Sequence, residues 1–257
     1  MANAEHKHYH DNVYDASSHF ETYTGANKAF NEDVMEDIME AVYKVLSSGS
    51  VKGDSLIDIS VGLMMFPLFV AADHFKNITM IESSDSSIES MEKWVNKDPS
   101  AVDKRHIAEF ACSLKGQSAG QEEQEDKVRN AIKHIVKWDI QDDKPMDSVV
   151  CSQADCLFSF AYLEVVCKDR NMYLKLLKQF CSLIKTGGHL ILIAVIDLSY
   201  YIIGEHKFFT LKLDEEFVRK ALIDSGFVIK SYSRIERKFK SPMTDYEHFG
   251  CFVACKV

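Results

Sequence analysis

One apolar run that ends in an acid and a turn of small residues constrains the fold of this chain most. The run is Ser55-Leu56-Ile57-Asp58-Ile59-Ser60-Val61-Gly62-Leu63, and a second acid, Glu82, follows the next apolar run, 78–81. The order strand, turn, helix, strand, acid is typical of the start of an open α/β sheet that binds a nucleoside at the carboxyl ends of its strands. The turn itself carries a single glycine.

The rest of the chain alternates between helical and extended patterns. Apolar periodicity and capping residues predict helices after the N-cap Asn31, at Met64–Ala72, after Ser84, and at Gln121–Val136, Met172–Ile184 and Asp214–Asp224. Apolar runs predict strands at Leu56–Ile59, Ile78–Ile81, Cys156–Phe160, His189–Ile196, Phe227–Ser231 and Phe249–Lys256. Strands joined by helical crossovers give the α/β class, with a mostly parallel sheet and helices on both faces. The last two strands lack a helix between them and predict an antiparallel terminal hairpin.

Length and composition favour one soluble domain. The 257 residues can bury one large core, so we expect a flexible tail at 1–12 and a single domain at 13–257, whose segment 13–30 forms an N-terminal lid. The net charge of −9 argues against nucleic acid or a membrane surface as a partner. The seven cysteines lack C-x-x-C spacing, which predicts reduced thiols, no metal site and a cytoplasmic location.

Three acids are expected at the ends of successive strands, namely Asp58, Glu82 and Asp139. At that edge of an open sheet, one carboxylate can accept both ribose hydroxyls and another can accept an adenine amino group. The chain has neither G-x-x-x-x-G-K-[ST] nor a complete G-x-G-x-x-G. This favours S-adenosylmethionine over a nucleotide whose phosphates need backbone amides.

Several short blocks of the chain form a recognisable set. They are Val51-Lys52-Gly53-Asp54, Leu56-Ile57-Asp58-Ile59, His74–Met80, Glu92-Lys93-Trp94, Ala154-Asp155-Cys156, Gly187-Gly188-His189-Leu190 and Tyr200–Glu205. Together these blocks resemble one known family, the nicotinamide, phenylethanolamine and indolethylamine N-methyltransferases. The resemblance runs from about Tyr14 to the end of the chain. It implies a Rossmann-like class I methyltransferase with a seven-stranded sheet, S-adenosylmethionine as methyl donor, a small amine or pyridine as acceptor, and a monomer.

On the donor side, the resemblance assigns roles position by position. Tyr23 matches a tyrosine of the segment that closes over the donor, and Gly62 matches a glycine of the donor loop. Glu82 matches the ribose-binding acid, while Asp139 and Ile140 match the adenine-side pair.

On the acceptor side, Glu164 and Asp197 match two acids near the amine in the phenylethanolamine enzyme, and Tyr201 matches an acceptor-pocket aromatic in the nicotinamide enzyme. The resemblance thus implies that Glu164 and Asp197 orient the amine and accept its proton. The aspartate that recognises the carboxamide of nicotinamide falls on Ala194, which favours an alkyl amine. Other interpretations stay open: Glu164 as an exposed loop or helix-start acid, Asp197 as the N-cap of a helix near Ser199, and Tyr201 as packing.

The donor loop differs from the family pattern Gly-Ser-Gly-Pro, because Ser60 and Val61 precede Gly62. Their side chains would enter the space where the backbone approaches the ligand, and β-branched Val61 resists positive φ. Two functions therefore remain. The first is an S-adenosylmethionine-dependent N-methyltransferase of a small amine or pyridine-type acceptor. The alternative is a catalytically impaired relative that serves as a small-molecule binding or structural protein.

Overall fold

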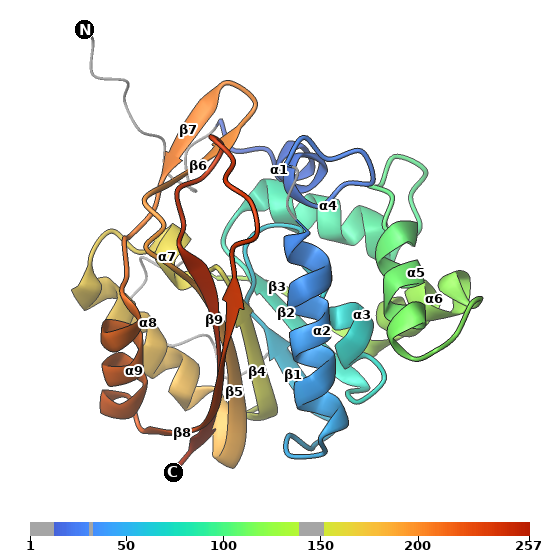
Figure 1. Ribbon diagram of the computed structural model, residues 1–257. Helices are drawn as coiled ribbons and strands as arrows, with labels where there is room; N and C mark the ends of the chain where they lie inside the picture. Colours follow the sequence, from blue (N-terminus) through green and yellow to red (C-terminus); the bar gives the residue numbers. More distant parts are fainter. Residues whose placement is uncertain (1–12, 31–32, 139–151) are drawn as a thin grey trace, which may run out of the picture.

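The computed structural model describes residues 13–30, 33–138 and 152–257. A seven-stranded sheet with the strand order β3-β2-β1-β4-β5-β9-β8 forms its centre (Figure 1). The strands are β1 (Ser55–Asp58), β2 (Asn77–Glu82), β3 (Ile132–Lys137), β4 (Ala154–Phe160), β5 (Ile184–Ile196), β8 (Phe227–Glu236) and β9 (His248–Lys256). Strands β1 to β5 pair in parallel, whereas β9 runs antiparallel between β5 and β8. The predicted α/β fold with an antiparallel terminal hairpin is confirmed.

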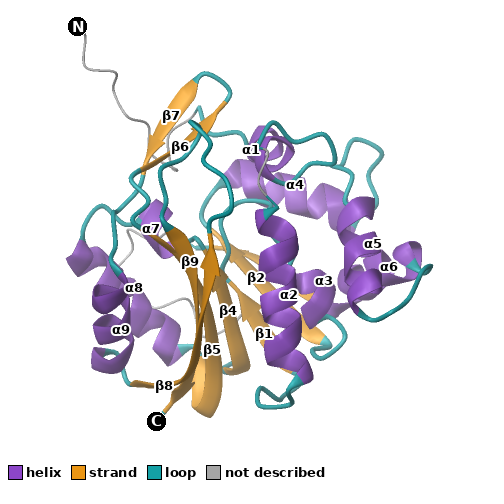
Figure 2. Cartoon of the chain, viewed as in Figure 1, coloured by secondary structure: helices purple, strands orange, loops and turns teal. Residues whose placement is uncertain are grey.

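Helices cover both faces of the sheet: α8 and α9 lie on one side, and α2 and α3 on the other (Figure 2). The helices are α1 (Ala16–Tyr23), α2 (Val34–Ser47), α3 (Leu68–Ala71), α4 (Asp85–Val95), α5 (Arg105–Leu114), α6 (Gln121–Ala131), α7 (Leu163–Val166), α8 (Arg170–Ser182) and α9 (Glu215–Asp224). Local capping sets where several of them begin. Ser84 accepts the backbone N–H of Ser87 at the start of α4, and Asp214 accepts that of Phe217 at the start of α9.

Three sequence-based expectations about elements are wrong. The helix expected over Gln121–Val136 ends at Ala131, and Ile132–Lys137 instead pairs with β2 as an edge strand. The crossover helix expected over Met64–Ala72 is helical only at Leu68–Ala71. No helix begins near Ser199; the chain there forms the hairpin of β6 (Tyr200–Ile203) and β7 (His206–Phe209).

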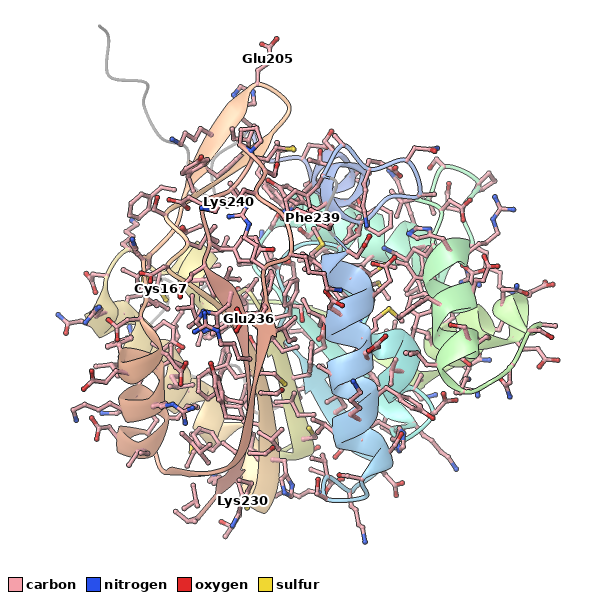
Figure 3. All side chains as sticks on the ribbon, viewed as in Figure 1. Cys167, Glu205, Lys230, Glu236, Phe239 and Lys240 are labelled. Carbon is pink, nitrogen blue, oxygen red and sulfur yellow. The ribbon has the colours of Figure 1, made fainter. Side chains whose placement is uncertain are left out.

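The carboxyl ends of β1, β4 and β5 lie beneath three covering segments: α1, the β6–β7 hairpin and the loop 237–247 after β8. Figure 3 shows Glu205 at the tip of the hairpin and Lys230 at the opposite end of the molecule. The chain leaves β1 toward β2 on one side and returns to β4 on the other. Such a reversal of strand order is where open α/β sheets bind ligands.

The cysteines in the described part of the chain, Cys112, Cys156, Cys167, Cys181, Cys251 and Cys255, are all free thiols. Within residues 13–30, 33–138 and 152–257, no group of three metal-ligating side chains gathers. None of the helices in these ranges is long and apolar enough to cross a membrane.

Candidate functional site

The turn after β1 places its left-handed backbone conformation on Gly62, at φ +55°. Ser60 and Val61 do not take positive φ. The Ser60 hydroxyl donates to Asp58 Oδ1 at 2.8 Å. The expected conflict between β-branched Val61 and positive φ therefore does not arise, because the glycine kept in this turn stands at the position that needs it.

The two acids at the ends of β1 and β2 are both buried. Asp58 is 1% exposed, and burial raises the pKa of its carboxyl to about 7, with a further increase from nearby Glu82 and an opposing effect of the Ser60 hydrogen bond. Glu82 accepts the Gly62 N–H at 3.1 Å through Oε2, and the N–H groups of Ser83 and Ser84 through Oε1. Acid and glycine thus form one hydrogen-bonded unit, as the sequence order predicted.

The N-terminal segment lies directly on this unit. A Cβ at Gly62 would stand 2.3 Å from the Tyr14 hydroxyl, which is hydrogen-bonded at 2.9 Å to His19 Nδ1. His19, on α1, is 5% exposed, and burial lowers its pKa to about 3, so the imidazole is neutral at pH 7. The segment therefore covers the glycine turn.

Two tyrosines join α1 to the β6–β7 hairpin. The Tyr23 hydroxyl donates to the carbonyl of Ile202 at 2.9 Å and accepts its N–H at 3.1 Å. The Tyr201 ring stacks on His19 and on Phe208, with ring centroids 5.3 and 5.1 Å apart. Tyr201 is 5% exposed, and its hydroxyl has no hydrogen-bond partner among the described residues.

A cavity of about 90 Å³ lies between these covering segments and the ends of β1, β4 and β5. Its lining comes from five parts of the chain and is almost entirely aromatic or aliphatic. The lining residues are His19, Tyr23, Thr24, Phe30, Val34, Val61, Met64, Phe66, Phe160, Ala161, Val165, Val195, Leu198, Tyr201, Thr244, Tyr246 and Phe249. No carboxylate or cationic side chain belongs to this described lining.

Glu164 lies beside the cavity but outside its lining. It is fully buried on α7, and its Oε1 accepts the N–H of Val195 at 2.5 Å, while Oε2 has no partner among the described residues. Burial raises the pKa of this carboxyl to about 7, against the effect of the Val195 hydrogen bond. Glu164 is an acid at the start of a helix, as one interpretation had it, but the exposure expected of it is wrong, because the side chain is buried.

Asp197 follows β5 with a left-handed backbone, φ +59°, and its carboxylate lies 3.5 Å from Lys212 Nζ. It also lies outside the cavity lining. It does not cap a helix, because β6 begins nearby at Tyr200. Ala194 is buried within β5, next to the lining residue Val195.

The structure thus brings Tyr23, Gly62 and Tyr201 to one place, with Asp58 and Glu82 beneath them. Asp139 and Ile140 lie outside the described residues. Sequence reasoning missed Ala161, which directly follows β4 with φ +51°, and Val195 near the end of β5. Their signal was position alone, since both stand where a predicted parallel strand reaches the ligand-binding edge.

The residues around Gly62 suit a nucleoside donor. A buried carboxylate at the end of β2 with a glycine N–H beside it matches a ribose diol, and the adjoining apolar cavity has room for a small organic group. Glu82 is fully buried and Tyr14 lies over Gly62.

Comparison with known proteins gives consistent results. The profile of the NNMT/PNMT/TEMT family matches residues 3–257. The chain is 32% identical to the nicotinamide N-methyltransferase of Homo sapiens over 91% of this chain and 88% of that protein. It is 34% identical to the indolethylamine N-methyltransferase of Oryctolagus cuniculus over 75% of this chain and 73% of that protein. A SAM-dependent methyltransferase from Methanosarcina mazei shares the fold, with a TM-score of 0.56 at 15% identity over 82% of this chain and 97% of that one.

Proposed function

Because the chain belongs to the NNMT/PNMT/TEMT family, we propose that it transfers a methyl group from S-adenosylmethionine to the nitrogen of a small aromatic acceptor that binds uncharged. The observation that carries the second half of this proposal is the absence of any carboxylate from the described cavity lining. An alkyl amine is protonated at neutral pH, as a lysine side chain is. Burying its ammonium in an apolar cavity without a counter-ion costs several kcal/mol.

The neutral imidazole of His19 supports the same acceptor class. An imidazole whose pKa is about 3 is neutral at pH 7, so it supplies no charge to the cavity. The Tyr201 hydroxyl is the buried polar group of the lining that has no partner among the described residues. We propose that it hydrogen-bonds a polar substituent of the acceptor, while the surrounding rings hold the acceptor ring.

Methyl transfer from a sulfonium is an in-line displacement, for which orientation supplies most of the rate. We propose that Glu82 binds the ribose, with Asp58 and Gly62 shaping the turn beside it. Glu164 then acts as a positioning residue, because its carboxylate holds the N–H of Val195, a residue of the cavity wall. The roles of Tyr23 at the donor, of Asp139 and Ile140 at the adenine, and of Asp197 near the acceptor stay predictions.

The geometry of the donor loop gives no support to the catalytically impaired alternative. Positive φ falls on Gly62, and the Ser60 side chain is engaged with Asp58. We further propose that the protein works in the cytoplasm without nucleic acid or a membrane as partner, on the strength of its net charge of −9 and the free thiols of its described cysteines. That it is a monomer stays an expectation from the family resemblance.

The test has a binding arm and a turnover arm. Calorimetric titration with S-adenosylmethionine and S-adenosylhomocysteine should give micromolar dissociation constants. Mass spectrometry of the products should then show, at pH 7, a kcat/KM for pyridines and quinolines at least about ten-fold above that for phenylethylamine and tryptamine. A preference for the alkyl amines would overturn the acceptor class, and no binding of millimolar donor would overturn the function itself.

A matched pair of variants tests the acceptor contact. Tyr201→Phe removes the buried hydroxyl that lacks a partner among the described residues and should raise the acceptor KM about five- to ten-fold, with an unchanged donor Kd. Tyr200→Phe removes the neighbouring hydroxyl, which donates to the Pro242 carbonyl at 3.2 Å outside the cavity. Equal acceptor KM values for the two variants would remove Tyr201 from the proposed site.

A further inference from the structure

Lys104 is a lysine with no exposed surface, an unusual environment for an ammonium group. It immediately precedes α5, and its Nζ lies 3.3 Å from the carbonyl oxygen of Leu63 and 3.7 Å from the centroid of the Phe20 ring. Burial lowers the pKa of Lys104 to about 7, while Glu21 on α1 and Glu125 on α6 act in the opposite direction. Burying an ammonium group costs free energy, and the contacts with the Leu63 carbonyl and the Phe20 ring offset part of that cost.

Both partners of Lys104 belong to segments that build the candidate site. Leu63 follows Gly62 directly, so its carbonyl belongs to the turn after β1. Phe20 follows His19 on α1, whose other face reaches the cavity. Lys104 therefore contacts the donor turn and the lid helix at the same time.

A second contact from the same region holds the C-terminal end of α1, one turn beyond Phe20. His106, two residues after Lys104, donates from Nε2 to the carbonyl of Thr24 at 2.6 Å, just beyond the end of the helix. The beginning of α5 thus fastens α1 near Phe20 and at Thr24. Tyr14 precedes α1 and is tied to it by the hydrogen bond of its hydroxyl to His19.

We propose that Lys104 is a positioning residue for the methyl donor, joining the turn after β1 to the lid helix α1 and so holding both in the geometry that binds the donor. This proposal rests on the proposed function. Lys104 touches neither the reacting atoms nor the cavity; it acts through Leu63 and Phe20.

The decisive variant is Lys104→Met, which keeps the unbranched stem and removes the nitrogen. Loss of the hydrogen bond to Leu63 and of the contact with the Phe20 ring should raise the donor Kd about ten-fold, measured by calorimetry. The kcat at saturating donor and the acceptor KM should stay within about two-fold of the wild-type values. The thermal midpoint should stay equal or rise, because a costly buried nitrogen is gone.

A raised donor Kd together with an equal or higher thermal midpoint distinguishes a positioning role from a merely structural one. A structural lysine would lower the thermal midpoint on replacement and would not single out the donor Kd. Lys97→Met is the matched control, because Lys97 is 56% exposed and pairs with Asp126 at 2.7 Å, away from α1 and the donor turn. It should leave the donor Kd unchanged.

If Lys104→Met fails to fold, Phe20→Leu tests the same contact from the lid side and should also raise the donor Kd selectively. A donor Kd that matches the wild type in the folded Lys104 variant overturns this proposal and leaves the proposed function standing. A wild-type protein that binds no donor overturns both.

Discussion

At the scale of single residues, Gly62 is the position on which the site depends. Its backbone takes φ +55°, its N–H reaches Glu82, and its missing side chain leaves room for the Tyr14 hydroxyl. Each of these is a separate reason for glycine. None of these three constraints applies to Ser60 or Val61, the two positions that differ from the family pattern.

Gly62→Ala should weaken both stability and donor binding. A left-handed alanine costs about 1 kcal/mol, and its Cβ at 2.3 Å from the Tyr14 oxygen forces that ring to move. We expect a lower thermal midpoint and a donor Kd raised at least ten-fold in calorimetry. Ser60→Gly is the comparison: it restores a family glycine, yet its donor Kd should stay within about two-fold. Marked tightening by Ser60→Gly would mean that the loop is impaired after all.

At the scale of elements, Asp155 joins the starts of β1 and β4 at the end of the sheet away from the cavity. Its Oδ2 accepts from the Asp54 N–H at 3.0 Å, the Ser55 N–H at 3.1 Å and the Ser55 hydroxyl at 2.8 Å. Lys185 Nζ lies 2.6 Å from Oδ1, and these donors together hold the pKa of the carboxyl well below its usual range. Two of the family-specific blocks, Val51–Asp54 and Ala154–Cys156, therefore meet at a structural contact.

Asp155→Asn should lower the free energy of unfolding by about 2 kcal/mol at pH 7 in urea titrations, because several charge-assisted hydrogen bonds weaken. A carboxyl with a lowered pKa contributes stability above its ordinary pKa and loses it as the pH falls. The difference from wild type should therefore narrow below about pH 4.

The donor Kd of Asp155→Asn should not change. Asp224→Asn, which removes an exposed pairing with Lys220, should cost less than about 0.5 kcal/mol. An equal loss of stability in these two variants would contradict the role given to Asp155.

At the scale of the whole molecule, the fold buries ionisable groups and thereby shifts their pKa values toward 7. The pKa values of acids rise and that of a lysine falls. Burial raises the pKa of Asp58 and Glu164 to about 7 and lowers that of Lys104 to about 7. The folded state therefore holds extra protons on the two acids below pH 7 and lacks one on the lysine above it. The two acids therefore lower the free energy of unfolding as the pH rises toward 7, whereas the lysine lowers it as the pH falls toward 7.

The pH dependence of unfolding should separate these effects by variant. Glu164→Gln keeps an acceptor for the Val195 N–H, and its stability relative to wild type should rise between pH 4.5 and 7, where only unfolded wild type releases the proton. The gain has an upper bound of about 3 kcal/mol. Lys104→Met should show its advantage below pH 7 and lose it between pH 7 and 10, where unfolded wild type keeps a proton that folded wild type lacks. Urea unfolding at each pH measures these differences. Stability curves that run parallel for wild type and both variants would contradict the shifted pKa values of Glu164 and Lys104.

The sequence by itself determined the α/β class, with a mostly parallel sheet and an antiparallel last pair of strands, the turn after the first strand and its two acids. These are local features: apolar runs, capping residues such as Ser84 and Asp214, and acids that directly follow strands. It also identified the family, through short blocks that lie mostly in strands and the turns beside them, and in one case within α4. It misjudged Ile132–Lys137, because charged i, i+4 pairs favour a helix up to the point where pairing with β2 takes over.

Only the tertiary structure decided which of the predicted side chains reach the cavity. Glu164 and Val165 are neighbours in sequence, yet the carboxylate points to the Val195 N–H and the valine lines the cavity. Likewise, nothing local marks Lys104 as buried, because its partners Leu63 and Phe20 lie in distant parts of the chain. Local sequence fixes where strands and turns form, but the direction of a side chain and the charge it can carry depend on packing between segments far apart in sequence.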